Sequence, residues 1–359
     1  MKRFLLIVLI ILVSAFILLR VVKEKVGNDL AQTVQDPAVS SSPTVVLDRS
    51  QKTNTSLFVP DWALDTIPGD YDQYIYFGIT PTKNGIDATA SGTQGVDSFN
   101  DAMPEGKQTL LALRMVDADT NDAILHNKTL QQQIASQAVA FAKEHGFSGI
   151  VLDLELSGIP FDSLVGEINS FVSQLDNQAK TQQLQFDVTL YGDTFYRLRP
   201  FTVKTIAANS DRIMIMAYDF HKSRSNPGPN FPLSGQDSYG YDMGKMADDF
   251  LQAVPNQKLV VIFGLYGYDW PVDAQGNAMG QGKALTYGQI RTKFLEGCSF
   301  KNCQVKRDSL SAETEIHYTD DANQRHIVWF EDMQSVTKKE QFLRKKGIGN
   351  FSFWANSYF

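Results

Sequence analysis

The chain has 359 residues, and it is poor in cysteine and histidine and lacks any large basic cluster. Its formal net charge is −7, and its basic residues gather only in short runs such as 338–339 and 344–346. The phosphate-neutralising patch that nucleic-acid binding needs is therefore missing. The five histidines are scattered without the spacing of metal ligands. These absences argue against nucleic acid as a partner, and the sequence predicts no metal and no other cofactor.

The only two cysteines, Cys298 and Cys303, lie in the segment GCSFKNC. In an oxidising compartment they can close a tight loop as a disulfide, and two free thiols are the alternative. No histidine lies near them, which makes a zinc site a poor explanation of this pair.

What the sequence does contain is enough apolar material for a large core, with 43% apolar and 11% aromatic residues. This composition is typical of a globular protein, and the length allows one large domain or two ordinary ones. We expect a monomer.

The N-terminus combines positive charge with a long hydrophobic run. Lys2 and Arg3 precede a largely apolar segment, residues 4–22, whose one charged residue, Arg20, can snorkel. We predict that residues 1–22 form a signal anchor, a single transmembrane helix, with the rest of the chain outside the cytoplasm. The alternative is a signal peptide cleaved after residues 13–15, which would secrete the protein.

Residues 23–56 are polar, with QDPAVSSSPT at their centre, and predict a flexible tether. As a random coil this tether spans roughly 30 Å, which keeps the following domain, residues 57–359, near the membrane surface.

After the tether, apolar strand-like runs alternate with helical patterns. In LQQQIASQAVAFAKEHG, for example, Ile134, Ala138 and Phe141 share one stripe, and Gly146 fits a C-terminal cap. Eight strands interleaved with helices predict a (β/α)8 barrel of the α/β class. A doubly wound open sheet is the alternative, but no glycine-rich phosphate loop follows the first strand. The predicted strands are 57–64, 73–80, 109–116, 149–156, 184–192, 212–220, 258–267 and 350–356.

The fourth predicted strand, GIVLDLEL, ends in two acidic residues. Because successive side chains of a strand point to opposite faces, Val151, Asp153 and Glu155 share one face and the two carboxylates lie side by side. Catalytic groups of such barrels come from the C-terminal ends of the strands. Polar and aromatic residues occupy the same place on other strands: Trp62, Tyr218, Asp219, Tyr266, Trp270 and Trp354.

Six segments in this order make the chain resemble glycoside hydrolase family 18, the chitinase-like barrels. They are GFSGIVLDLE, IMIMAYDF, SNPGPNFPL, KLVVIFGLYGYDW, HIVWFED and GNFSFWANS. The resemblance covers residue 57 to the C-terminus and is closest to the bacterial branch that includes spore cortex-lytic glycosidases. The family signature DxxDxDxE falls on Ser148, Val151, Asp153 and Glu155, so that only its last two acids are present.

The resemblance implies roles for individual residues. Glu155 would be the general acid and base, Asp153 would orient the substrate's N-acetyl group, and Asp153 would also keep Glu155 protonated by like-charge repulsion. By the family's MxYD motif, residues 216–219, Tyr218 would donate a hydrogen bond to the acetamido carbonyl. The residues expected to contact substrate are Met216, Asp219, Trp354, Tyr266, Trp270 and Trp62.

Some of these assignments have structural alternatives. Trp62 fits the sugar cleft or a core or rim position equally well, and Tyr266 and Trp270 form either a subsite wall or packing against the segment that follows. That segment, residues 271–328, resembles a short α+β insertion between the seventh and eighth strands. Val151 is either an ordinary filler of a barrel layer or the reason why Asp153 is held less firmly.

The resemblance implies a membrane-anchored, extracytoplasmic glycosidase that acts on a polymer with β-linked N-acetylglucosamine, peptidoglycan or a chitin-like glycan, with retention of configuration. The alternative is a carbohydrate-binding barrel at the cell envelope that has lost turnover with the first two signature acids.

Overall fold

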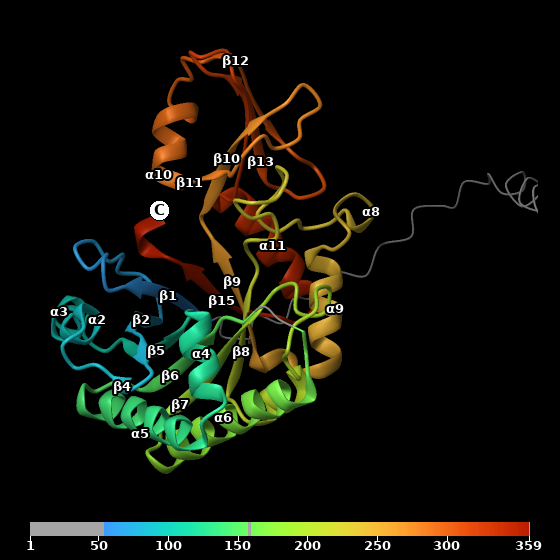
Figure 1. The fold of residues 1–359 in the computed structure, drawn as a ribbon. Coiled ribbons are helices and arrows are strands. Elements are labelled where there is room, and N and C mark those ends of the chain that lie inside the picture. Colours follow the sequence, from blue (N-terminus) through green and yellow to red (C-terminus); the bar gives the residue numbers. More distant parts are fainter. Residues whose placement is uncertain (1–53, 157–158, 359) are drawn as a thin grey trace, which may run out of the picture. The chain divides into compact units, whose positions relative to one another are not determined.

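The computed structural model describes residues 54–156 and 159–358, which form a closed barrel of eight parallel strands with helices around it (Figure 1). The predicted (β/α)8 barrel is confirmed, and the open sheet is excluded because β1 pairs with both β15 and β2. In spatial order the strands are β1 (Thr55–Pro60), β15 (Asn350–Trp354), β9 (Leu259–Gly264), β8 (Arg212–Met216), β7 (Gln185–Tyr191), β6 (Gly149–Leu154), β5 (Gln108–Met115) and β2 (Gln73–Ile79).

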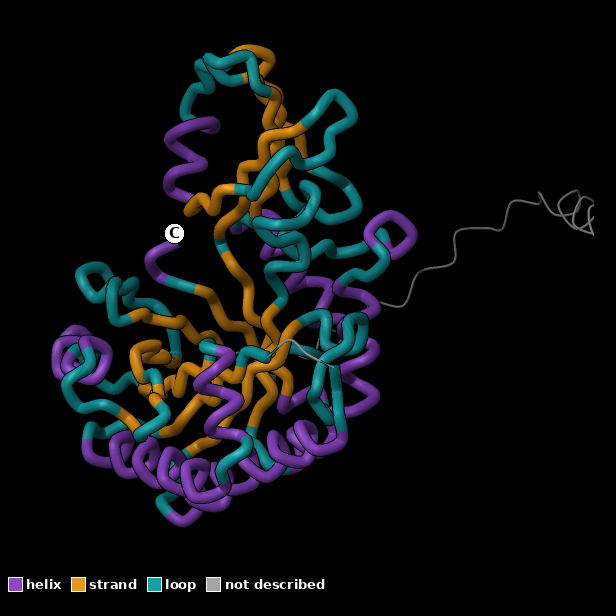
Figure 2. The backbone as a smooth tube through the Cα atoms, viewed as in Figure 1, coloured by secondary structure: helices purple, strands orange, loops and turns teal. Residues whose placement is uncertain are grey.

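The helices lie outside the barrel and follow its strands along the chain (Figure 2). A small hairpin, β3 (Pro81–Thr82) and β4 (Gly85–Ile86), precedes them. They are α2 (Ser91–Gln94), α3 (Val96–Ala102), α4 (Ala118–Leu125), α5 (Lys128–Glu144), α6 (Asp162–Thr181), α7 (Val203–Ala208), α8 (Gln236–Tyr239), α9 (Met243–Ala253), α10 (Tyr287–Ile290) and α11 (Met333–Lys345).

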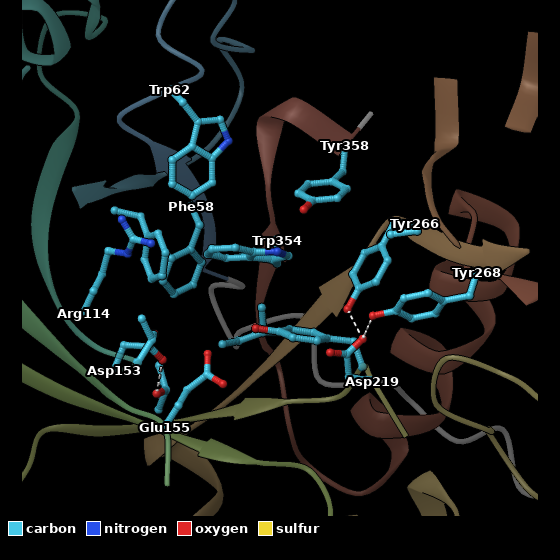
Figure 3. Close-up of a pocket in the computed structure, with 16 residues that line it drawn as sticks. Phe58, Trp62, Arg114, Asp153, Glu155, Asp219, Tyr266, Tyr268, Trp354 and Tyr358 are labelled. Atoms are coloured by element: carbon cyan, nitrogen blue, oxygen red, sulfur yellow. Dashed lines mark hydrogen bonds between the residues drawn. The ribbon is translucent and has the colours of Figure 1, made fainter. Parts of the chain in front are cut away.

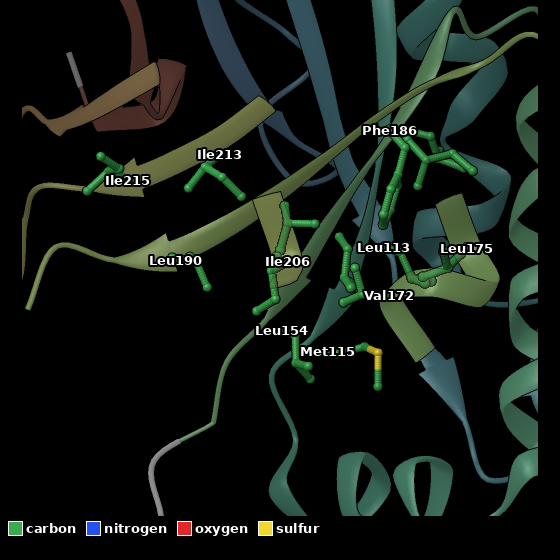
Figure 4. Packing of buried hydrophobic residues seen from close by; sticks show 14 of the residues in the cluster. Leu113, Met115, Leu154, Val172, Leu175, Phe186, Leu190, Ile206, Ile213 and Ile215 are labelled. Atoms are coloured by element: carbon green, nitrogen blue, oxygen red, sulfur yellow. The ribbon is translucent and has the colours of Figure 1, made fainter. Parts of the chain in front are cut away.

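The two-residue period of the strands divides the apolar residues between two clusters. On the outer face of the barrel, Leu113 and Leu154 lie in one cluster with Val172 and Leu175 of α6 (Figure 4). Val151, whose neighbours in sequence face outward, belongs to the second cluster, which fills the barrel interior. Both faces of the barrel strands are therefore largely buried, so that a polar side chain on them needs a hydrogen-bond or ion-pair partner.

Helix α5 shows how the local pattern sets an element. Its stripe buries Ile134 and Ala138 completely, and it stops before Gly146, whose φ of 78° is in the left-handed region that favours glycine. The helix predicted from this pattern is confirmed.

The predicted signal anchor lies outside the described residues, as does the tether up to Thr53. Within residues 54–156 and 159–358, no helix is both long and apolar enough to cross a membrane. The first barrel strand begins at Thr55, two residues before the predicted domain boundary.

The predicted α+β insertion is a five-stranded antiparallel sheet that starts directly after β9 (Figure 1). Its first strand begins at Tyr266 and its last ends at Phe330, so it is somewhat longer than the predicted 271–328. A disulfide joins Cys298 to Cys303, which lies within one of the strands of this sheet. The strands are β10 (Tyr266–Val272), β11 (Lys283–Thr286), β12 (Lys301–Arg307), β13 (Thr314–Thr319) and β14 (Arg325–Phe330).

A buried ion cluster ties the insertion to the barrel's last helix. Lys339 of α11 is fully buried, and its Nζ lies 2.6 Å from Glu313 Oε1 and 2.5 Å from Glu331 Oε2. Burial raises the pKa of Glu331 to about 8 although the lysine opposes this. The two carboxyl groups thus share a single buried lysine.

We expect Lys339→Met to destabilise the fold strongly. Methionine fills a similar volume but leaves two buried carboxyl groups without their cation, which costs about 3–5 kcal/mol. Urea unfolding followed by circular dichroism measures this change. Lys338→Met, which removes the exposed neighbouring lysine, is the control and should change stability by less than about 0.5 kcal/mol. Equal stabilities of the two variants would contradict the role of the ion cluster.

Candidate active site

A pocket of about 320 Å³ opens at the C-terminal ends of the barrel strands (Figure 3). Residues that are far apart in sequence meet there because all eight parallel strands end at the same face of the barrel. Seven of the residues singled out in the sequence line it: Trp62, Asp153, Glu155, Tyr218, Asp219, Tyr266 and Trp354.

Asp153 and Glu155 enter the pocket from β6, on the same face as Val151, as the strand period requires. Each carboxyl group accepts a hydrogen bond from β7: Thr189 Oγ1 donates to Asp153 Oδ1 at 2.6 Å, and Tyr191 OH donates to Glu155 Oε2 at 3.2 Å. Thr189 and Tyr191 are two residues apart, like the carboxylates that they contact. The neighbouring strand therefore orients both carboxyl groups.

The two carboxyl groups differ in burial. Asp153 is 4% exposed, and its burial, together with repulsion from Glu155, raises its pKa to about 7 although the Thr189 hydrogen bond and Arg114 oppose this. We predicted that Asp153 would keep Glu155 protonated. That role stays a prediction, and the raised pKa described above belongs to Asp153, the deeper member of the pair.

Ser148 and Val151 stand where the family signature has its first two acids, and neither lines the pocket. Ser148 precedes β6 and is exposed at the N-terminal end of the strand, opposite the pocket. Val151 is fully buried in the apolar interior cluster, which agrees with its interpretation as a barrel filler. Thr189 donates a hydrogen bond to Asp153 from the next strand, so Asp153 has a partner that Val151 does not offer; that Val151 holds Asp153 less firmly stays a prediction.

Tyr218 follows β8 and faces the two carboxyl groups across the pocket floor. Burial, with the nearby charges of Asp153 and Glu155, raises the pKa of its phenol well above the ordinary value. The hydroxyl therefore keeps its proton at any physiological pH and is a permanent hydrogen-bond donor.

Asp219 adopts a left-handed backbone conformation with φ of 58°. Its backbone N–H donates to Asn230 Oδ1 at 2.7 Å, and its Oδ1 accepts hydrogen bonds from Tyr266 OH at 2.5 Å and Tyr268 OH at 2.9 Å (Figure 3). The two tyrosines come from the first strand of the insertion. The insertion thereby completes one side of the pocket.

Aromatic rings form the apolar surface of the pocket. Trp354, at the end of β15, packs against Phe77 and Phe58 with ring centroids 4.5 and 5.5 Å apart. Trp62 is 56% exposed at the rim and contacts Phe77 edge-on. Trp62 therefore lines the pocket from its rim and is not a core residue.

Two predicted contact residues lie elsewhere. Trp270 is fully buried in the insertion, where its Nε1 donates to Ser223 O at 3.2 Å and its ring lies over Gly282, so it is packing and not a subsite wall. Met216 does not line the main pocket but belongs to the interior cluster and lines a small adjoining cavity of about 40 Å³, which shares Glu155, Tyr218 and Asp219 with the pocket.

The sequence analysis missed several pocket residues. Thr189 and Tyr191 stand two apart at the end of a strand whose neighbour carries Asp153 and Glu155, and this shared period was the available signal. Arg114 is a lone charge in the apolar run LLALRMV, and its Cα pairs in register with that of Asp153.

Within residues 54–156 and 159–358, no group of three histidine, cysteine or acidic side chains is arranged to hold a metal ion. The functional groups of the pocket are carboxyl groups, phenols, one guanidinium and aromatic rings.

Comparison with solved structures confirms the fold at low sequence identity. A family 18 chitinase from Cycas revoluta in complex with (GlcNAc)3 superposes with a TM-score of 0.70 at 20% identity, over 84% of this chain and 94% of that one. The spore cortex-lytic enzyme SleL of Bacillus cereus superposes with a TM-score of 0.68 at 18% identity, over 85% and 71% of the two chains.

Sequence comparison places the chain among known relatives. The sporulation-specific glycosylase YdhD of Bacillus subtilis is 23% identical over 235 residues, which are 64% of this chain and 52% of that protein. This chain thus spans about half the length of that relative. The predicted likeness to the spore cortex-lytic branch is confirmed by YdhD and SleL. The model of glycosyl hydrolases family 18 matches residues 116–358, more than half of the chain, and the chain therefore belongs to this family.

Proposed function

We propose that the protein is a glycosidase that hydrolyses a glycan with β-linked N-acetylglucosamine. The observation that supports this most directly is that Asp153, Glu155 and Tyr218 meet in one pocket that Trp354 also lines. A family 18 relative of the same fold was solved with (GlcNAc)3, which is consistent with an N-acetylated sugar in the pocket.

The first step uses the sugar's own acetamido group, so no protein nucleophile is needed. The acetamido oxygen attacks the anomeric carbon, the glycosidic C–O bond breaks, and Glu155 transfers its proton to the leaving oxygen. Tyr218 donates a hydrogen bond to the acetamido oxygen, and Trp354 supports the C–H face of the sugar ring.

The second step reverses the proton transfer. Water attacks the anomeric carbon of the oxazolinium ion from the face that the leaving group has vacated, and Glu155, now ionised, accepts the proton of the water. The bond to the acetamido oxygen breaks, and the sugar leaves with its original configuration.

Glu155 must carry a proton before the first step, because it is the general acid. In the free protein Asp153 has the raised pKa of about 7, because Asp153 is the more buried group. A bound sugar would cover Glu155 as well and remove its water, which favours the neutral form that the first step requires.

A carbohydrate-binding barrel without turnover is the second candidate. The observation in its favour is that Val151 and Ser148 replace the first two acids of the family signature. The hydrogen bond from Thr189 to Asp153 favours the enzyme instead.

The location and the polymer are part of the proposal. The predicted signal anchor and tether would hold the pocket within tens of ångströms of the membrane, where cell-wall glycan is the nearest polymer. The expected substrate is therefore peptidoglycan in preference to free chitin.

Glu155→Gln should reduce hydrolysis of an N-acetylglucosamine oligomer and of purified peptidoglycan by about two to four orders of magnitude, because the amide cannot donate the proton. Release of reducing ends measures this loss. Glu144→Gln, an exposed residue of α5, is the matched control and should keep full activity. No turnover by the wild-type chain, with oligomer binding retained, would support the binding barrel instead.

Tyr218→Phe should lower kcat on the same oligomer about 100-fold, since one donor to the developing oxazolinium is lost. KM should change much less, because the charge develops only in the transition state. Tyr287→Phe, in the insertion, serves as the control. A variant that raised KM alone would show that Tyr218 only binds the ground state.

Asp153→Asn should change the pH dependence of stability. The folded carboxyl has a pKa of about 7 and the unfolded one the ordinary 3.8, so wild-type stability falls as pH rises through this window. Asparagine does not titrate. The free energy of unfolding of the variant, relative to that of the wild type, should therefore rise by on the order of 3 kcal/mol between pH 4 and pH 8. Urea unfolding at both pH values tests this, with the exposed Asp101→Asn as control. A difference that does not change with pH would refute the raised pKa.

A further inference from the structure

Arg114 is a charged pocket residue that the proposed reaction does not use. It stands near the end of β5, in register with Asp153, and lines the pocket at the side of Trp62 (Figure 3). Its side chain is only 20% exposed.

The guanidinium of Arg114 contacts two aromatic rings closely, whereas its one carboxylate partner is distant. Its central carbon lies 4.4 Å from the ring centroid of Phe77 and 5.2 Å from that of Trp62. Its ion pair with Asp61 is 3.8 Å long, and the buried Nε has no hydrogen-bond partner among the described residues. Of the five N–H donors of the planar guanidinium, the one on Nε is therefore buried without an acceptor.

A partly buried guanidinium without hydrogen-bond acceptors destabilises the folded protein, and a ligand that supplies the acceptors removes this cost. Desolvation lowers the pKa of Arg114, although Asp61, Asp153 and Glu155 all favour its charged form. The acceptor that best matches the guanidinium fork is a carboxylate, which can bind through two parallel hydrogen bonds. A neutral glycan offers only hydroxyl and amide oxygens at this place.

The opposite side of the pocket has the opposite character. Asp219, with Tyr266 and Tyr268, lies across Trp354 from Arg114 (Figure 3). Arg114 is the one cation among the described residues that line this pocket, although Asp61 and Asp153 lie near it, whereas the side of Asp219 offers an anion and two phenols. An anionic group on the substrate is therefore better accommodated at the side of Arg114.

We propose that Arg114 is a specificity-determining residue that binds a carboxylate carried by the glycan, so that the substrate is an anionic N-acetylhexosamine polymer. The inference rests on the proposed glycosidase function and names its substrate class. In peptidoglycan this carboxylate has two sources, the lactyl group of N-acetylmuramic acid and the stem peptide. The contrasting explanation, that Arg114 only packs Trp62 and balances Asp153, predicts no discrimination between neutral and anionic glycans.

The test measures Kd by calorimetry with the full chain carrying Glu155→Gln, which binds without turnover, with and without Arg114→Met. Three tetrasaccharides serve as probes: (GlcNAc)4, peptide-free GlcNAc–MurNAc repeats, and the same repeats with stem peptides. Arg114→Met should weaken binding of a carboxylate-bearing probe about 10- to 100-fold, as expected for a lost hydrogen-bonded charge pair. Binding of (GlcNAc)4 should change less than about threefold, since it has no carboxylate. The probe with the larger loss identifies the source of the carboxylate.

Two further variants separate recognition from general electrostatics. Arg114→Lys keeps the charge without the fork and should recover only part of the loss. Lys222→Met removes another cation near the same acids, beside Tyr191, and should leave the preference between probes unchanged. An equal loss for all three probes in Arg114→Met, or the same selective loss in Lys222→Met, would overturn the proposal. Failure of the chain with Glu155 intact to hydrolyse any probe would count against the glycosidase function alone, because these Kd values do not depend on turnover.

Discussion

The alternation of side chains along two adjacent parallel strands is the constraint on which the pocket depends. On β6 it turns Val151 into the barrel core and Asp153 and Glu155 to the same face, nearer the C-terminal end. On β7 it places Thr189 and Tyr191 opposite the two carboxyl groups. A slip of one residue in either strand would turn these groups out of the barrel, so the register that closes the barrel also assembles the acids.

The insertion contributes to the pocket through a chain of buried polar contacts. Lys339 pairs with Glu313, whose Oε2 accepts a hydrogen bond from the backbone N–H of Asn230 at 2.5 Å. The side chain of Asn230 in turn holds the backbone of Asp219, which accepts hydrogen bonds from Tyr266. These contacts join α11, the insertion and the loop after β8 into one chain of hydrogen bonds that ends at the wall of the pocket.

Burial has a larger effect on the pKa values of Asp153 and Arg114 than the neighbouring charges have. Asp153 lies deepest and is the acid whose pKa rises, whereas Arg114 lies between aromatic rings near the rim and lacks a close acceptor. A polar group that is left without a partner in a folded protein is expensive. In a cleft, such a group indicates what kind of group the ligand carries. Arg114 beside Trp62 and Asp219 beside Tyr268 give the two sides of the pocket different charges.

The sequence by itself determined the strand order along the chain, the barrel class and the shared face of Asp153 and Glu155, because these follow from local period and from motifs with fixed spacing. The position of Trp354 in the cleft was expected from its place on the eighth strand, whereas the sequence left Trp62 open between the cleft and a core or rim position. Only the tertiary structure decided which strands are neighbours in register, and hence that Thr189 supports Asp153 where Val151 cannot. It also buried Trp270 in the insertion, assigned the raised pKa to Asp153 and brought Arg114 beside Trp62. These properties depend on burial and on contacts between distant segments, which no local pattern encodes.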